Sequence, residues 1–589
     1  MWGTGERWGS QVALRLWLLA CAACSDEAQR VLPQRDPQND PQNSPESAEG
    51  PLDPPVSTSL EELYDPEHVL EVSIELDAAD WAALRGEGRG LFDVFLGQSE
   101  GYEFTEFTAA ATVDGQRYEG VAVRKKGFLG SLSRLRPSLK LDFGDELLGA
   151  PRGFKGLTLN NDRQDPSHAR QCLAYGLFTK AGLPAPRCNL AHVSVNGEDL
   201  GTFSNIEAIK KPFLARHFGD DSGNLYEGQT VDFTANDIDR FQLKTNEAEN
   251  DRSDLERLVS ALDAPDAELV ARSSEVLDLD QFRDFWALET LSGHWDGYTG
   301  DQNNYYIYAD PESGRFKFIP WGTDGSFADK NPFDPLNTTR TVYAHSRIAS
   351  RLYALPDERE RFRQRLGELR ANLWDEAALV SELDAWTERA GNASPEATLA
   401  LKNHLQTHGG LLRAELAEPA PEWIELPDDP SPCGNTVSDL SIEFSTEYGD
   451  LAEVSPERGT FQAALTLDGA PFEGFWFGRA GFEAMPAGGM PAGGSAEPVV
   501  LLRALSFWAE GTGLLVQLSV PEAEFAPGSR ALHGLESFGV VLALDGAETR
   551  LVGFVSRGTL ELDAASPVLG ARVSGRLNAG LLQLTCADL

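Results

Sequence analysis

Residues 280–327, DQFRDFWALETLSGHWDGYTGDQNNYYIYADPESGRFKFIPWGTDGSF, carry the pattern that decides the fold. The pattern predicts a helix, then a loop with Asp296, Asn303 and Asn304, then two strands at 305–308 and 315–319. The residues DPESG between the strands predict a tight turn. Because a hairpin brings the loop before its first strand beside the loop after its second, we expect Asp324 near the other three side chains.

Carboxylates and amides gathered in this way are hard oxygen ligands, which suit Mg²⁺ or Mn²⁺. The alternative is an acidic loop that is simply solvated, as loops often are in so acidic a chain. The neighbouring Trp295, Pro320 and Trp321 favour a built site over a solvated loop.

Composition limits the class of protein. The chain has 589 residues and a formal net charge of −42. Its length predicts more than one domain. Its acidity argues against nucleic acid as a partner, because binding phosphate backbones requires Lys and Arg. Its ordinary hydrophobic content indicates a folded chain with a charged surface.

The first residues resemble an export signal. An apolar run at 12–23 follows Arg7, is too short to span a bilayer and contains Arg15. The residues before Cys21 and Cys24 both resemble the cleavage box of bacterial lipoproteins, so either cysteine is a candidate for lipidation. An ordinary secretion signal is the alternative. We expect a signal peptide at 1–24 and a Pro- and Asn-rich tether at 25–58, with the membrane reached only through the lipid anchor.

The most basic stretch of the chain follows a predicted hairpin at 107–113 and 118–124. Gly127 and Gly130, together with Arg124, Lys125, Lys126 and Arg134, are candidates for a loop that holds phosphate. An exposed basic hairpin end is the alternative. On the next predicted strand, 138–143, Leu139 and Leu141 share one face, so Lys140 points to the other.

The rest of the chain alternates between strands and helices. Further predicted elements are a strand at 70–76, a helix at 77–84, a helix starting at 165–167, a hairpin at 190–195 and 200–206, a helix at 211–218, and helices at 348–355, 357–373, 376–389 and 395–412. After a Pro-rich linker, short alternating runs at 433–589 predict an all-β, sandwich-like domain. Cys172 with Cys188, and Cys433 with Cys586, are candidate disulfides in an exported chain.

Several motifs keep their order along residues 67–420: VRKKGFLGS, RPSLKLDF, GLTLNNDRQDPSHARQCLAYGLF, HWDGYTGDQNNYYIY and FKFIPWGTDGSF. Together they resemble the CotH family of spore-coat protein kinases. The resemblance implies an α+β fold, a divergent two-lobed protein-kinase-like domain at 59–424 and transfer of phosphate from ATP, with Mg or Mn, to Ser or Thr of a protein substrate that the sequence does not identify.

The resemblance also implies roles for single residues. Lys140 would contact the α/β-phosphates as a catalytic residue, with Glu207 as its partner, and Asp296 would act as base or metal ligand. Asn304 and Asp324 would hold the metal. The residues expected to bind the nucleotide are Arg124, Lys126, Gly127, Lys140 and Glu207.

The sequence departs from the family pattern at one site position. Many relatives carry PWDxD where this chain has Gly322 before Asp324, which removes one carboxylate. An inactive kinase-like surface lipoprotein of the cell envelope is therefore the alternative to an active kinase. A hydrolase that uses Asp296 and Asp324 as a carboxylate pair is a third hypothesis.

Overall fold

The computed structural model describes residues 61–88, 103–127, 131–144, 154–329, 331, 339–423, 434–449, 459–467, 470–472, 476–485, 497–509, 512–532, 538–545 and 548–585. The predicted signal peptide, the tether, the lipidation candidates Cys21 and Cys24, and the candidate pair Cys433 and Cys586 lie outside these residues. No helix in the described ranges is long and apolar enough to cross a membrane.

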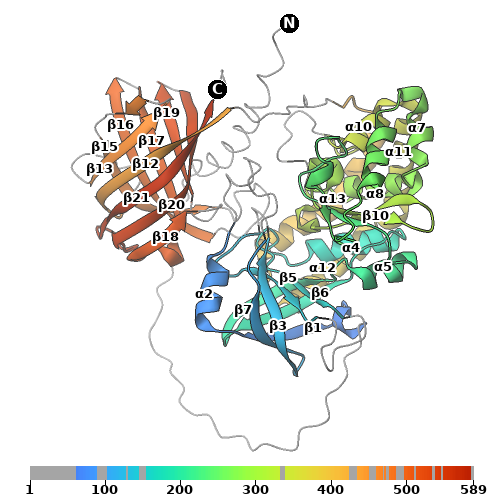
Figure 1. Cartoon of the computed structure of the whole chain (residues 1–589), viewed down its shortest axis with the longest axis horizontal. Helices are drawn as coiled ribbons and strands as arrows, with labels where there is room; N and C mark the ends of the chain where they lie inside the picture. The colour runs from blue at the N-terminus through green and yellow to red at the C-terminus, as the bar shows by residue number, and fades with distance from the viewer. Residues whose placement is uncertain are drawn as a thin grey trace, which may run out of the picture.

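The first folded unit is a closed seven-stranded barrel (Figure 1). Its strands, in the order β1-β2-β3-β4-β5-β7-β6, are β1 (Val69–Glu75), β2 (Phe107–Val113), β3 (Gln116–Lys126), β4 (Ser138–Asp142), β5 (Gly156–Asn160), β7 (Glu198–Ile206) and β6 (Cys188–Val195). β1 pairs in parallel with β6 and closes the ring, while the other neighbours are antiparallel. The predicted alternation on β4 is confirmed, because Leu139 and Leu141 are buried and Lys140 between them is not.

Two short elements accompany the barrel, one before β1 and one between β1 and β2. They are η1 (Glu62–Tyr64) and α2 (Ala78–Gly86). Asp77 caps α2 by accepting hydrogen bonds from the backbone N–H groups of Ala79 and Asp80, which explains why the predicted helix starts there.

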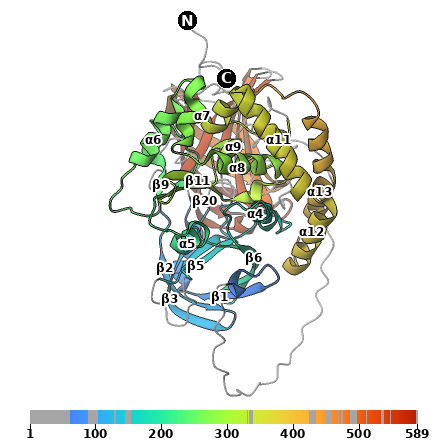
Figure 2. The same ribbon diagram turned by 90° about the vertical axis from the view of Figure 1, so that its right-hand side faces the viewer.

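The second unit is a four-stranded sheet, in the order β11-β10-β8-β9, surrounded by helices (Figure 2). Its strands are β8 (Leu225–Gly228), β9 (Gln242–Leu243), β10 (Tyr305–Asp310) and β11 (Arg315–Pro320). The helices are α4 (Arg170–Lys180), α5 (Lys211–Phe218), η2 (Ile238–Arg240), α6 (Ser253–Leu262), α7 (Asp266–Ser274), α8 (Leu279–Leu291), α9 (Tyr298–Asp301), η3 (Thr323–Gly325), α10 (Arg347–Ala354), α11 (Pro356–Leu373), α12 (Glu376–Ala390) and α13 (Pro395–Leu416).

Aromatic side chains build the core of this second unit. Trp286 of α8 stacks on Phe362 of α11 with ring centroids 3.7 Å apart. The predicted disulfide between Cys172 and Cys188 is confirmed and joins α4 to barrel strand β6. Helices α6 and α7 have no counterpart among the sequence predictions, although Leu255, Leu258 and Leu262 carry the helical spacing that would have indicated α6.

The C-terminal unit is all-β, as predicted, and its strands form one continuous hydrogen-bonded sheet of ten strands. The strands are β12 (Gly434–Glu447), β13 (Gly459–Leu467), β14 (Ala470–Phe472), β15 (Trp476–Met485), β16 (Glu497–Ala509), β17 (Thr512–Pro521), β18 (Gly528–Leu532), β19 (Phe538–Asp545), β20 (Glu548–Ala564) and β21 (Arg572–Thr585), with η5 (Glu522–Glu524) between β17 and β18. The strand order is β14-β13-β12-β21-β20-β19-β17-β16-β15, with β18 also paired to β20. Hydrogen bonding passes without a break from β12 through β21 and β20 to β19, which the sequence did not predict. Apolar side chains from most of these strands form one shared core.

Candidate functional site

The hairpin β10–β11 places the two predicted loops together. Tyr305 pairs with Pro320, so Asn304 and Trp321 leave the hairpin at the same end. The backbone N–H of Trp321 donates to the carbonyl oxygen of Asn304 at 3.3 Å. Gly322 adopts a left-handed conformation with φ of +53°, and a Cβ atom there would lie 2.5 Å from Asn304 Oδ1. Glycine at this position therefore permits the close approach of the two loops.

Asp296 is the centre of a small hydrogen-bonded cluster. Asn303 Nδ2 donates to Asp296 Oδ1 at 3.1 Å, and Asn304 Nδ2 donates to Asp296 Oδ2 at 2.7 Å. The buried Glu289 stabilises this loop, because its carboxylate accepts hydrogen bonds from the backbone N–H groups of Tyr298 and Thr299. The predicted gathering of Asp296, Asn303 and Asn304 is thus confirmed.

Asp324 lies in η3, within electrostatic reach of Asp296. Burial raises the pKa of Asp324 to about 6, while Lys126 acts in the opposite direction. Burial also raises the pKa of Asp296 well above its usual range, and the charges of Asp301 and Asp324 add to the effect. Two partly buried carboxylates that repel each other would be stabilised by a cation between them.

The donor set fits a hard divalent cation that also binds phosphate. In the described part of the chain, no group of three or more His, Cys, Asp or Glu side chains converges as a metal site. Mg²⁺ in phosphate-transfer sites is commonly held by one or two carboxylates together with substrate phosphates. Asp324 and Asp296 supply the two carboxylates, and the Asn304 Oδ1 atom supplies a further oxygen ligand.

Cations from the barrel lie opposite these carboxylates. Lys126, at the end of β3, donates to Asn160 Oδ1, and its Nζ atom lies 5.9 Å from the centre of the Trp321 ring. Burial lowers the pKa of Lys126 to about 8, and Asp324 is the strongest of the charges that oppose this shift. Lys125 points away and donates to the carbonyl oxygens of Arg85 and Glu87 at 2.9 Å and 2.6 Å.

Lys140 lies on the neighbouring strand, directly opposite Arg124 in the ladder. Burial, together with Arg124, lowers the pKa of Lys140 to about 8. The glutamate that opposes this shift is Glu227 of β8. Burial alone would raise the pKa of Glu227, but Lys244 and Lys140 outweigh it and hold that pKa below its usual value.

The expected pairing of Lys140 with Glu207 is therefore corrected. Both oxygens of Glu207 accept hydrogen bonds from Arg216, and Oε1 also accepts one from Arg187 at 2.8 Å. Glu207 thus links helix α5 to the end of strand β7. Glu227 was missed because nothing in its local sequence distinguishes it from other glutamates at strand ends.

Arg170 is a second residue whose place the sequence did not reveal. Its guanidinium donates to the carbonyl oxygens of Ser326 and Phe327, two and three residues after Asp324. Asp165 accepts hydrogen bonds from the first backbone N–H groups of α4 and lies 3.6 Å from Arg170 Nε. Arg170 is thus an ion-pair partner of Asp165 that also supports the loop after Asp324. His168, to which the sequence assigned no role, lies 2.8 Å from a buried oxygen of Asp162.

The predicted phosphate loop is described only in part. Gly127 has φ of +125°, and a Cβ atom there would lie 2.6 Å from Ser131 Oγ. Gly130 lies outside the described residues. Arg134 points away from the carboxylates, toward the C-terminal domain, where it pairs with Glu524 at 3.1 Å.

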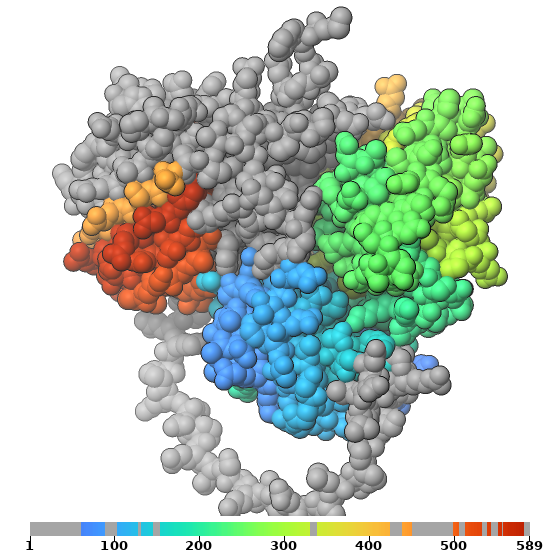
Figure 3. All heavy atoms as spheres, viewed as in Figure 1, coloured from blue at the N-terminus to red at the C-terminus, as the bar shows by residue number. Residues whose placement is uncertain are grey.

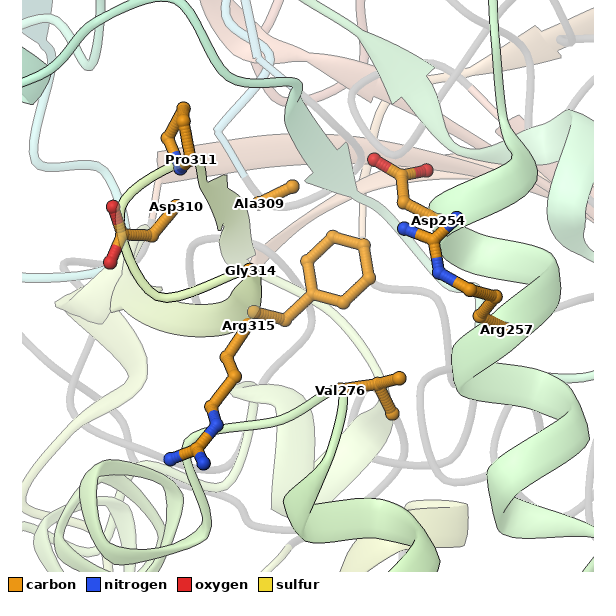
Figure 4. A pocket seen from close by; sticks show the side chains of 9 residues that line it. Asp254, Arg257, Val276, Ala309, Asp310, Pro311, Gly314 and Arg315 are labelled. Atoms are coloured by element: carbon orange, nitrogen blue, oxygen red, sulfur yellow. The ribbon is translucent and has the colours of Figure 1, made fainter.

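A separate pocket of about 190 Å³ lies at the other end of the hairpin (Figure 4). Asp254, Arg257, Asp310 and Arg315 are among its lining residues. Because β10 is six residues long, this pocket is roughly 17 Å along the strand from Asn304 and is not part of the candidate site.

Lys126 and Lys140 of the barrel thus lie within electrostatic reach of carboxylates of the second unit, Asp324 and Glu227. The family described as CotH kinase protein matches residues 123–417, which is half of the chain, and the chain belongs to that family. It is 26% identical to inner spore coat protein H of Bacillus subtilis over 190 residues, which cover 30% of this chain and 51% of that protein.

Two fungal proteins are also similar. Invasin CotH7 of Rhizopus delemar is 27% identical over 176 residues, covering 28% of this chain and 29% of that protein. Spore coat protein homolog 1 of the same organism is 28% identical over 158 residues, covering 25% and 26%. The chain thus spans about half the length of the bacterial relative and less than a third of the fungal ones.

Proposed function

We propose that the chain is an atypical protein kinase that transfers the γ-phosphoryl group of ATP to a Ser or Thr side chain, with Mg²⁺ or Mn²⁺. The observation that carries the proposal is the pair of partly buried carboxylates, Asp296 and Asp324, whose charges act on each other, with Lys126 acting on Asp324. Phosphoryl transfer needs cations on the phosphates and a carboxylate beside the attacking hydroxyl. The description of the family as kinases supports the same reaction.

Each residue has a distinct role in this proposal. Lys126 and Lys140 bind the phosphate oxygens, and Asp324 with Asn304 Oδ1 holds the divalent cation. A bound cation supplies charge neutralisation at the phosphates and lowers the pKa of the carboxylates around it. Asp296 accepts the proton of the attacking hydroxyl, and the amide of Asn303 stabilises its ionised form through the hydrogen bond described above.

The test is phosphate transfer by the full chain. The protein is incubated with labelled ATP and Mg²⁺ or Mn²⁺, and wild type is compared with Asp324→Asn, Lys126→Met and Lys140→Met. We expect each substitution to lower incorporation by roughly 10²-fold or more, because each removes a charge that stabilises the transition state. Asp280→Asn is the matched control, since that carboxylate is exposed on α8. Incorporation that survives all three substitutions, or a folded wild type without incorporation, would sink the proposal.

A binding protein without transferase activity is the second candidate function. Gly322 favours it, because the site then keeps only two carboxylates where many relatives are expected to have three. Calorimetry with ATP and Mn²⁺ separates the two candidates: a binding protein gives a titration without label transfer. If neither binding heat nor label transfer is observed, the result indicates a structural role for the domain.

We also propose that the protein is exported and anchored to the cell envelope by a lipid on Cys21 or Cys24. The spore-coat and invasin names of the relatives support a location outside the cytoplasm. Replacing both cysteines with Ser is expected to move the protein from the membrane fraction to the soluble fraction. Retention in the membrane fraction would contradict the anchor.

A further inference from the structure

The loop between β3 and β4 connects the two lysines of the candidate site. Lys126 ends the strand before the loop, and Lys140 lies on the strand after it. The described part of this loop, residues 131–137, is held closely against the barrel. Its carbonyl oxygens accept hydrogen bonds from three side chains of two other segments: Asn161 to Ser131 and Arg136, Arg163 to Leu132, and Arg85 to Arg134 and Leu135.

One side chain of this loop reaches a different domain. Arg134 Nη1 lies 3.1 Å from Glu524 Oε2, although the residues are 390 positions apart in the sequence. Only 20% of the Arg134 side chain and 17% of the Glu524 side chain are exposed, so the pair is covered by its surroundings. Figure 3 shows the barrel, in blue, next to the β domain, in orange and red, and the Arg134–Glu524 pair joins the two.

The acidic partner is fixed within the β domain. Glu524 ends the short helix η5, which follows β17. Its charge also acts on Arg530 of β18. Burial lowers the pKa of Arg530, and the charge of Glu524 partly opposes this shift. Glu524 therefore lies between an arginine of its own domain and an arginine of the barrel loop, which is a complementary arrangement of charge.

The contact and the proposed nucleotide site use different residues of this region. Arg85 donates to the backbone carbonyl of Arg134, and the Arg134 side chain pairs with Glu524. Lys126, before the loop, is instead acted on by the charge of Asp324.

We propose that the C-terminal β domain docks in cis on residues 131–137 through Glu524 and Arg134, and that this contact holds the loop in position for nucleotide binding. The second half rests on the proposed function. A partly exposed ion pair alone changes a binding constant by a factor of about five or less. Because a short covalent connection gives an effective concentration in the millimolar range, such weak contacts suffice for docking within one chain and keep it reversible.

Hydrogen–deuterium exchange of the full chain tests the docking directly. In Glu524→Arg we expect the amides of residues 131–137 to exchange about five- to tenfold faster, and in Arg134→Glu the same change at residues 522–530. In the double variant the acidic and the basic residue exchange positions. The attraction is then restored, so the exchange rates should return toward those of wild type. Glu522→Arg is the matched control in the same short helix and should leave residues 131–137 unchanged. Unchanged exchange across the interface in both single variants, or no recovery in the double variant, would overturn the docking.

Calorimetric titration with ATP and Mn²⁺ tests the consequence on the same four variants. We expect the two single variants to bind ATP several-fold more weakly than wild type, and the double variant to recover. Faster exchange with unchanged ATP affinity would overturn the role of docking in nucleotide binding. If wild type binds no ATP, the proposed function and the second half of this inference fall together, and the exchange data still decide the docking.

Discussion

The charge of Glu227 is the most informative feature to perturb. Glu227 forms an ion pair with Lys244 at 2.7 Å and raises the pKa of both Lys140 and Lys126. Replacing it with Gln keeps the size of the side chain and removes the negative charge. Burial and the neighbouring Arg124 then act on Lys140 without that opposition.

The size of the effect follows from the pKa of Lys140, which is about 8. A nearby opposite charge commonly shifts a pKa by about one to three units. Taking the lower figure, Glu227→Gln moves the pKa of Lys140 to about 7. At pH 7.5 the protonated fraction then falls from about three quarters to about one quarter.

The assay is the affinity of the full chain for ATP with Mn²⁺, measured by calorimetry between pH 6 and pH 9.5. Only a protonated lysine attracts phosphate, so affinity is retained at low pH and lost as the pH rises through the pKa of Lys140. We expect the midpoint of this loss near pH 8 in wild type and about one unit lower in Glu227→Gln. Glu207→Gln is the control, because the carboxylate of Glu207 binds Arg187 and Arg216 instead.

Equal midpoints in wild type and Glu227→Gln would refute the reasoning that Glu227 sets the charge of Lys140. A lowered midpoint in Glu207→Gln alone would instead support the pairing of Lys140 with Glu207 that the sequence suggested. Protonation of ATP itself is common to all the proteins and does not affect the comparison.

Three further predictions concern stability, measured by urea unfolding of the full chain. Gly322→Ala should destabilise the protein by about 1–2 kcal/mol, because a side chain at positive φ is strained and its Cβ atom would crowd Asn304; an unchanged midpoint would contradict the close approach. Removing the disulfide with Cys172→Ser and Cys188→Ser should cost about 3 kcal/mol, given a sequence separation of 16 residues. Reductant should lower the stability of wild type but not of that double variant, and an equal effect on both would argue against the bridge. Asp165→Ala should cost about 1–2 kcal/mol, since two backbone N–H groups at the start of α4 lose their acceptor; a smaller loss than in the exposed cap variant Asp375→Ala would count against this.

Much of the candidate site was predictable from one stretch of sequence. The Gly- and Pro-containing turn and the two alternating strands specify a hairpin, and a hairpin by its geometry joins the loops at its open end. Asp296, Asn304 and Asp324 therefore came together as expected. The alternation of Leu139, Lys140 and Leu141 likewise predicted which side chain of β4 leaves the barrel core.

The partners of the charged residues were not predictable in the same way. Glu207 and Glu227 both lie at or near the ends of strands, and no local pattern tells which of them faces Lys140. The answer depends on how the barrel packs against the second sheet. Arg134 shows the same limit, because its partner Glu524 belongs to another domain.

The sequence by itself determined many of the strands, most of the helices, the hairpin and the family, because these depend on turn residues, on periodicity and on the order of motifs along the chain. Only the tertiary structure decided that the β domain is one continuous sheet, that Glu227 acts on Lys140, and that Arg134 turns away from the site. The physical reason is that a side chain's partner across an interface depends on the packing of whole elements, and that packing is not encoded in the few residues on either side.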